Sequence, residues 1–259
     1  MMSPSESNFE SQSSTQVQIR EIQEIAITLA AKNLNPAMLS EDFLKFSGIV
    51  PNEWELSKQP ILTPNFAQVN FQNGVSIASQ PRTIAFVETV NLQIPEQLNI
   101  PKAARQYIEK LPHAEYQTLS ISPKSIIPFS GGEDSARKYI TGTLLSPGAW
   151  QEFGNVPMQA GLNLLYQLEK CQFSLNINEA KVQIGDRAAI PALLFAGSFN
   201  YNVGIDSEPE RLQLLIQGLN RWQTDLATFR DIVNKRFLGQ ASQRFFGEQD
   251  QEALFPRLN

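Results

Sequence analysis

Residues 68–78 read QVNFQNGVSIA, with apolar and polar side chains alternating on both sides of the Asn73-Gly74 pair. Alternation with a period of two is typical of a β-strand with one buried face. An Asn-Gly pair between two such runs is a strong hairpin signal. The segment therefore predicts antiparallel strands at 68–71 and 75–78. The outward positions of the first strand are Gln68, Asn70 and Gln72.

Similar patterns predict further elements on either side of this hairpin. Alternating apolar residues predict strands at 23–32 and 83–90, and a helical pattern predicts a helix over 101–111. A short helix is expected after Ser40, because a serine hydroxyl can cap a helix start. Later in the chain the patterns predict strands at 115–122, 173–177, 181–184 and 192–203, and helices near 133, over 158–170 and from 209.

The order of these elements is the same in two parts of the chain. Weak local similarities fall in register with that order, as between Ser40-Glu41-Asp42 and Gly132-Glu133-Asp134. We interpret the fold as α+β, with two related halves that each form an antiparallel sheet with helices on one face. Each half would run strand, helix, loop, three strands, helix, and a pseudo-two-fold axis would relate them. Coincidence of element order is the alternative.

The duplication also predicts segment boundaries and an exposed sheet face. We expect a disordered tail over 1–18, a first α+β repeat over 19–112, a second over 113–238 and a C-terminal extension over 239–259. The hairpin at 69–77 would correspond to 175–184. Uncharged side chains on the exposed face could bind a polar ligand or another surface, although a solvated face is the common outcome. In the second repeat the outward residues of the exposed sheet face would be Ser174, Asn176 and Asn178.

Composition excludes several classes of site. A net charge of −5 gives no broad positive field, which disfavours nucleic acid as a partner. One cysteine, Cys171, excludes an internal disulfide and a paired-thiolate zinc site, and one histidine, His113, excludes a histidine-rich metal site. The apolar runs are too short for a membrane-spanning helix, and the N-terminal residues lack an export signal. We therefore expect a cytoplasmic protein with no cofactor.

The C-terminal helix carries the most regular apolar pattern. A helix over 208–237 would be about 45 Å long, whereas a strand is typically under about 20 Å. Part of the apolar seam would therefore need another partner. A second copy of the chain could supply it, or the seam could fold back internally on the 158–170 helix or after a break near Trp222. The seam residues are Leu212, Leu215, Leu219, Trp222, Leu226, Phe229 and Val233.

One short motif resembles an active site. Ser130-Gly131-Gly132-Glu133-Asp134-Ser135 is similar to the SGGxDS phosphate-binding loop of the N-type ATP pyrophosphatase family, whose members adenylate a substrate. The resemblance implies that Ser130, Gly131, Gly132 and Ser135 contact pyrophosphate and that Asp134 helps hold magnesium. It also implies a parallel, doubly wound sheet. The segments that follow instead predict antiparallel strands, and under the duplication Glu133 and Asp134 correspond to the first-turn carboxylates Glu41 and Asp42.

Together these patterns favour a non-enzymatic protein that binds another protein or itself. The expected surfaces are the 208–237 helix and the amide-lined sheet face. The alternative is an ATP-dependent adenylating enzyme that uses the loop at 130–135. A third class, a nucleic-acid binder similar to TATA-binding proteins in pseudo-symmetry alone, is opposed by the acidic charge and the absence of basic strand positions.

Overall fold

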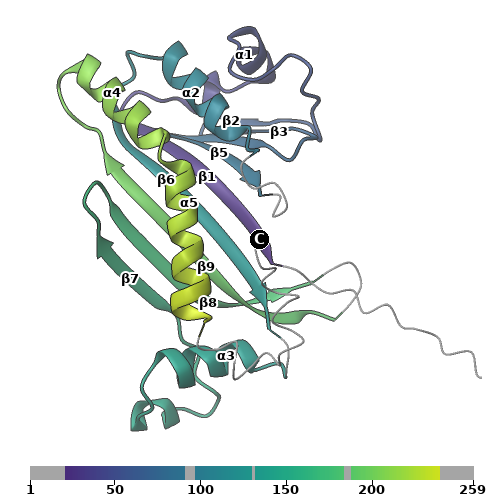
Figure 1. Ribbon diagram of the computed structural model, residues 1–259. Coiled ribbons are helices and arrows are strands. Elements are labelled where there is room, and N and C mark those ends of the chain that lie inside the picture. The colour runs from purple at the N-terminus through teal and green to yellow at the C-terminus, as the bar shows by residue number, and fades with distance from the viewer. Residues whose placement is uncertain (1–20, 91–96, 130–131, 184–187, 240–259) are drawn as a thin grey trace, which may run out of the picture.

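A single antiparallel sheet dominates the computed structural model, which describes residues 21–90, 97–129, 132–183 and 188–239 (Figure 1). The strand order is β2-β3-β4-β5-β1-β6-β9-β8-β7, and each neighbouring pair is antiparallel. The fold is therefore α+β, as predicted. The strands are β1 Ile22–Ala31, β2 Ile61–Thr63, β3 Phe66–Asn70, β4 Ser76–Gln80, β5 Thr83–Thr89, β6 Tyr116–Pro128, β7 Leu162–Gln167, β8 Gln172–Val182 and β9 Ile190–Asn202.

The longer helices form a layer on one face of this sheet. In Figure 1, α2, α4 and α5 all lie in front of the strands. Tyr107 of α2 packs edge-on against Phe86 of β5, with ring centroids 5.7 Å apart. The helices are α1 Glu41–Phe46, α2 Ile100–Lys110, α3 Ser135–Tyr139, α4 Glu208–Leu219 and α5 Trp222–Asp231, with short 3-10 turns at Pro36–Met38 and Ala149–Glu152 and π-helical turns at Ile140–Leu144 and Ile232–Phe237.

The core lies between the sheet and the helix layer because the strands alternate. On β1, Ile25, Ile27 and Leu29 are fully buried, whereas the residues between them are partly exposed. Leu29 pairs with Ile84 on one side and with Leu119 on the other. Because neighbouring residues in register share a face, these apolar side chains continue across the sheet beneath the helices.

The predicted hairpin at 68–78 is confirmed. Val69 of β3 pairs with Ile77 of β4, and both side chains are fully buried. Gly74 supplies the left-handed backbone that the turn needs, with φ +86°. The Asn73 side chain supports the turn because its Oδ1 accepts a hydrogen bond from the Val75 amide at 3.1 Å.

The helix predicted over 158–170 is wrong. The segment forms β7, in which the partly buried Leu162 and Leu164 alternate with exposed residues. Tyr166 stacks on Phe173 of β8 with ring centroids 5.7 Å apart. The leucine-rich composition resembles that of a helix, but the apolar side chains repeat every two residues.

Separate strands at 173–177 and 181–184 are also wrong, because β8 is continuous over Gln172–Val182. Asn178 and Glu179 pair with Leu194 and Leu193 of β9 and do not form a turn. The proposed correspondence between 69–77 and 175–184 therefore fails, since the first is a hairpin and the second lies largely in one strand. Long-range pairing with β9 overrides the weak local strand propensity of these polar residues.

The continuous helix over 208–237 is wrong as well, and the alternative, a break near Trp222, is confirmed. α4 ends at Leu219, and α5 begins at Trp222 after a tightened turn in which the Arg221 amide donates to the Gly218 carbonyl at 3.0 Å. The break allows both helices to pack on the sheet of their own chain. Of the seven seam residues, Leu212 and Trp222 are partly exposed, whereas Leu215, Leu219, Leu226, Phe229 and Val233 are at most 3% exposed.

Glu88 at the end of β5 anchors the start of α2. Its buried carboxylate accepts hydrogen bonds from the Asn99 amide at 2.7 Å, the Ile100 amide at 3.1 Å and the Asn99 side chain at 2.8 Å. A carboxylate at this end of a helix also interacts favourably with the helix dipole. Glu88 therefore ties α2 to the sheet.

We expect Glu88→Gln to lower the free energy of unfolding by about 1 kcal/mol, because one carboxylate acceptor is replaced by an amide donor that faces the helix N–H groups. Urea denaturation measures this loss. The matched control is Glu109→Gln at the exposed end of the same helix, which should change stability by less than about 0.5 kcal/mol. Equal losses in the two variants would contradict the capping role.

Candidate functional site

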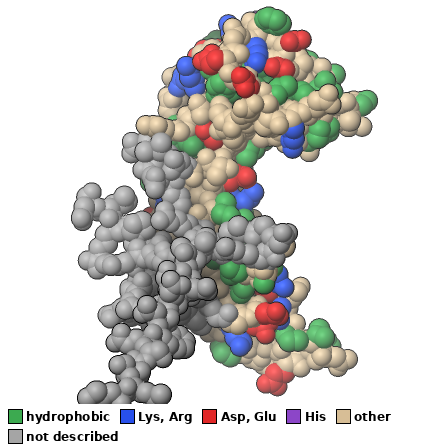
Figure 2. Space-filling view, turned by 90° about the vertical axis from the view of Figure 1, so that its right-hand side faces the viewer, with side chains coloured by type: hydrophobic (Ala, Val, Ile, Leu, Met, Phe, Trp, Pro, Cys, Tyr) green, Lys and Arg blue, Asp and Glu red, His purple; other side chains and the backbone are tan. Residues whose placement is uncertain are grey.

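The face of the sheet opposite the helices has no second layer of helices or strands among the described residues. We call it the open face. In Figure 2, which views the molecule from the side, the outline opposite the helix layer is hollowed between an upper and a lower lobe. A concave antiparallel sheet without a cover is a candidate binding surface, because it presents a broad area of fixed backbone and side chains.

Small uncharged side chains make up most of the open face. Strand alternation and register place methyl, hydroxyl and amide groups there. Across the described strands, the ionisable side chains at outward positions are Glu24 and Lys124, which form an ion pair of 2.7 Å. The central outward residues are Ala26, Thr28, Ser120, Ser122, Ser198 and Asn200, flanked by Ala85, Val87, Ser76, Asn70 and Gln68 on one side and Ser174, Asn176 and Asn178 on the other.

Hydrogen bonds between strands fix several of these groups. Asn200 Oδ1 accepts from the Ser120 hydroxyl at 2.6 Å and from the Ser198 hydroxyl at 3.1 Å. The Gln68 Nε2 donates to Asn70 Oδ1 at 3.1 Å and to Ser76 Oγ at 3.0 Å. Asn70 Nδ2 has no hydrogen-bond partner among the described residues. The face therefore carries pre-oriented polar groups, one of which is an unsatisfied amide donor.

Both edges of the sheet expose large apolar side chains. On edge strand β2, Ile61 is 42% and Leu62 is 59% exposed, and on edge strand β7, Leu165 is 64% and Tyr166 is 38% exposed. Edge strands also carry backbone groups that have no sheet neighbour. The open face is thus an uncharged polar surface between two apolar margins.

Sequence analysis identified part of this face. The structure places Gln68, Asn70, Ser174, Asn176 and Asn178 at outward strand positions, while Gln72 lies in the turn and donates to the Leu56 carbonyl at 3.3 Å. The central serines and Asn200 were missed. The alternation of polar and apolar residues around Ser120 and Ser122 could have shown that these serines point outward. Their place at the centre of the face depends on the pairing of β6 with both β1 and β9.

The SGGEDS segment lies between β6 and α3, and its Ser130 and Gly131 fall outside the described residues. Asp134 forms an ion pair with Arg137 at 3.1 Å, and the buried Ser135 Oγ has no hydrogen-bond partner in the described part of the chain. A pocket of about 380 Å³ adjoins the segment. The carboxylates of Glu133, Asp134 and Glu179 line it together with the cations of Arg137 and Lys181. The carboxylates outnumber the cations, so the lining opposes the binding of a polyphosphate in the absence of metal ions.

The fold implied by the pyrophosphatase resemblance is not the fold of this chain. β6 pairs antiparallel with both β1 and β9, so the segment does not follow a strand of a parallel sheet. Nucleotide sites of doubly wound proteins lie at the carboxyl ends of parallel strands. The resemblance is therefore limited to the six residues of the motif.

The seam contributes little accessible surface, whereas the single histidine is exposed and lies beside a carboxylate. Four of the five most buried seam residues, among them Leu215 and Phe229, belong to the core between the sheet and the helix layer. His113 is exposed, and its Nδ1 lies 3.1 Å from Glu208 Oε2. The buried seam residues therefore supply no accessible site in the folded chain.

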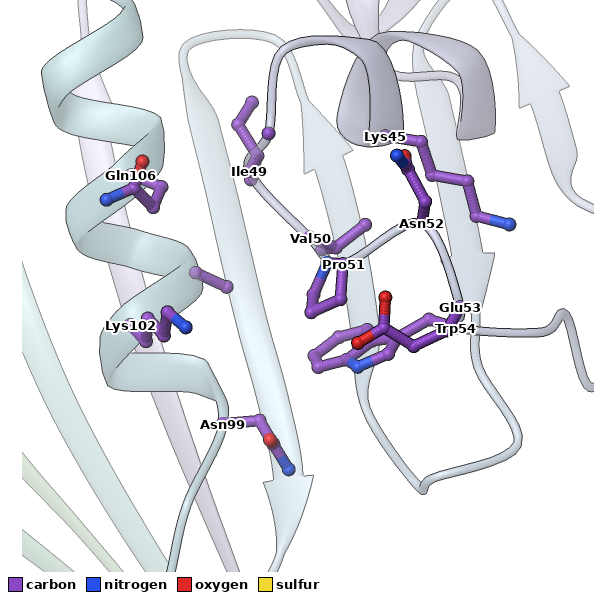
Figure 3. Close-up of a pocket in the computed structure, with 12 residues that line it drawn as sticks. Lys45, Ile49, Val50, Pro51, Asn52, Glu53, Trp54, Asn99, Lys102 and Gln106 are labelled. Carbon is purple, nitrogen blue, oxygen red and sulfur yellow. The ribbon is translucent and has the colours of Figure 1, made fainter.

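A pocket that sequence analysis missed lies between α2 and the loop before β2 (Figure 3). Its volume is about 530 Å³. Val50, Pro51 and Trp54 face Lys102 of α2 across it, and Trp54 packs edge-on against Phe71 with ring centroids 5.1 Å apart. Lysines and the carboxylate of Glu53 both line the pocket, so it has no clear charge preference.

A scan of the chain against protein-family models finds no match, and a search of the curated proteins finds none either. No helix in the described ranges is long and apolar enough to cross a membrane. The functional interpretation therefore rests on the geometry of the chain itself.

Proposed function

We propose that this chain is a protein-binding protein that receives its partner on the open face. The observation that carries the proposal is a broad concave sheet whose outward positions are mostly small and are uncharged apart from the Glu24–Lys124 pair, with larger apolar side chains at Ile22, Ile126 and Leu194. The cores of protein interfaces are depleted in charged residues, since each unpaired charge costs desolvation energy. Methyl and hydroxyl side chains such as Ala26 and Ser122 also allow a partner to approach the strands closely.

The shape of the open face favours a different protein over a second copy. Two concave faces that meet leave a gap between them. A partner with a convex surface would instead fill the hollow seen in Figure 2. The exposed apolar margins, with Leu62 on β2 and Leu165 on β7, would contact the flanks of such a partner. Nucleic acid fits poorly, because the one lysine at these outward positions is paired with a carboxylate.

An internal duplication is part of this proposal. The first half contributes β3-β4-β5-β1 and the second contributes β6-β9-β8-β7, with β1 and β6 antiparallel at the centre. In both halves the first strand pairs with the last, and this arrangement supports a pseudo-two-fold relation. The open face would then be a pair of similar halves, and it would suit a partner that is itself elongated across β1 and β6.

The test introduces an arginine at the centre of the open face. A partner would first be identified by cross-linking from this face and then purified. Its affinity would be measured by calorimetry for the wild type, Ser122→Arg and Gln223→Arg. Ser122 lies on β6 among outward positions, whereas Gln223 is exposed on the helix side. We expect Ser122→Arg to weaken binding by about 30-fold or more, because an unpaired charge is buried, and Gln223→Arg to have no effect.

Circular dichroism and urea denaturation would show that both variants fold. Unchanged affinity in Ser122→Arg would contradict the proposal, as would equal losses in the two variants. Sedimentation of the wild-type chain alone is a further measurement. A dimer that Ser122→Arg dissociates would show that the face binds a second copy of the chain.

A further inference from the structure

A third pocket lies on the helix side of the sheet, away from the open face. It has a volume of about 520 Å³ and lies between the turn that joins β7 to β8, the end of β9 and the junction of α4 and α5. This volume is within the range of small-molecule sites. The polar residues that line it are Lys170, Tyr201, Asn202, Gln217, Asn220 and Arg221.

A buried hydrogen-bond chain forms one wall of this pocket. The Tyr201 hydroxyl donates to Asp225 Oδ2 at 2.7 Å, and the Arg221 Nε donates to the Tyr201 hydroxyl at 3.2 Å. Tyr201 is 6% and Asp225 is 3% exposed. Burial raises the pKa of the Asp225 carboxyl, while the Tyr201 hydrogen bond and the Arg221 charge lower it. The chain holds the Arg221 guanidinium in place at the pocket.

The pocket has an excess of positive charge. Lys170 and Arg221 line it, and neither has a carboxylate within ion-pair distance among the described residues. No carboxylate lines this pocket, whereas carboxylates line both of the pockets described above. In a chain with a net charge of −5, two cations without a direct ion pair at one pocket give that pocket a positive lining, although Arg221 is linked to the buried Asp225 through Tyr201.

Two asparagines at the pocket are oriented as donors. Asn202 Oδ1 accepts from the Gly204 amide at 3.1 Å, and Asn220 Oδ1 accepts from the Arg105 guanidinium. Neither Nδ2 makes a hydrogen bond with another described residue, so each is available to donate. The hydrogen-bonding capacity of the pocket is therefore dominated by donors, which matches an anionic acceptor.

We propose that this pocket binds a small organic anion, with a carboxylate or phosphate group between Lys170 and Arg221. The planar guanidinium can donate two parallel hydrogen bonds to either group. Asn220 donates to the remainder of the ligand, and Tyr201 and Asp225 act as positioning residues for Arg221. The proposal is independent of the open face, because the two sites lie on opposite sides of the sheet.

The test measures binding of three probes by calorimetry to the full chain: inorganic phosphate, ribose 5-phosphate and 2-oxoglutarate, each up to about 10 mM, which corresponds to weak affinity. The variants are Lys170→Gln, Arg221→Gln and the control Lys102→Gln, an exposed lysine that lines the pocket of Figure 3. We expect saturable binding of at least one organic probe. Each site variant should weaken it by about 10-fold or more, because a charge-assisted hydrogen bond is lost.

Several results distinguish the outcomes. Preference for ribose 5-phosphate identifies the anionic group as phosphate, and preference for 2-oxoglutarate identifies it as carboxylate. No saturation by any probe would overturn the proposal. Equal weakening of binding by Lys102→Gln would also overturn the proposal, because the loss of any surface cation would then have the same effect. Lys170→Gln keeps the test valid if Arg221→Gln disturbs folding, because Lys170 is exposed and its side chain makes no hydrogen bond within the described residues.

Discussion

Phe229→Ala is expected to lower the free energy of unfolding by about 3–5 kcal/mol, the largest effect of any single substitution considered for this chain. Phe229 of α5 is fully buried. It sits over Gly197 of β9, where an added Cβ would lie 2.8 Å from Phe229 Cδ2 and 3.1 Å from the Phe173 ring. The Phe229 ring thus fills the space that Gly197 leaves open because it has no side chain. Removing the ring creates a cavity between α5 and the sheet. Urea denaturation at two protein concentrations measures the loss.

Phe153→Ala is the matched control for this experiment. Phe153 is 90% exposed, so the same truncation should change stability by less than about 0.5 kcal/mol. The unfolding midpoint of the wild type should not depend on protein concentration, because the seam packs within one chain. A midpoint that rises with concentration, together with a small loss in Phe229→Ala, would show that the seam joins two chains.

Tyr201→Phe is expected to lower the free energy of unfolding by about 1.5–3 kcal/mol at neutral pH, the second largest effect. The substitution removes the hydroxyl that donates to Asp225 at 2.7 Å and leaves the buried carboxylate without that donor. Ring packing is retained, since phenylalanine has the same shape. Denaturation at several pH values measures the loss.

The pH dependence of this loss follows from the direction of the Asp225 shift. Burial raises the pKa of Asp225 in the folded chain, so the ionised form is disfavoured by folding. In the unfolded chain the carboxyl titrates near its ordinary value of about 4. The folding penalty is therefore absent below that pH, grows as pH rises towards the folded-state pKa and is constant above it. Because Tyr201→Phe raises the folded-state pKa further, its deficit should be larger at neutral pH than at about pH 4.

Asp225→Asn provides the reference for that experiment. The asparagine oxygen can still accept from Tyr201 but carries no charge, so Tyr201→Phe in this background should cost about 1 kcal/mol at every pH. The same deficit at acid and neutral pH in the Asp225 background would show that Tyr201 acts through packing and not through the carboxylate.

Elements with a strong local signal could be predicted from the sequence. The hairpin around Gly74 is an example, because alternation and turn chemistry act within ten residues. The cap at Ser40 is another, since its hydroxyl accepts from the Phe43 amide at 3.0 Å. In both cases the stabilising groups are neighbours in the chain, so the sequence carries the whole signal.

Elements that depend on distant partners could not be predicted. β7 is a strand because Leu162 and Tyr166 pack beside β8, and the second half of β8 continues because Glu179 and its neighbours pair with β9. The same limit applies to the sites. The amides of Gln68 and Asn70 were visible in a local pattern, whereas the link from Tyr201 to Asp225 joins residues on different elements across the helix–sheet boundary. The pocket beside Tyr201 and the Arg221 cation that lines it are brought together only by the tertiary fold.

The central position of β1 has a consequence for synthesis of the chain. Among the described strands β1 is made first, but its neighbours are β5 at 83–89 and β6 at 116–128. The nascent strand therefore emerges with Ile25, Ile27 and Leu29 uncovered and no sheet partner until at least 50 more residues, about three to ten seconds of translation, have followed. Such non-local pairing slows folding and prolongs the exposure of an apolar strand. In the cell, β1 therefore depends for its protection from aggregation on strands that are made at least 50 residues later.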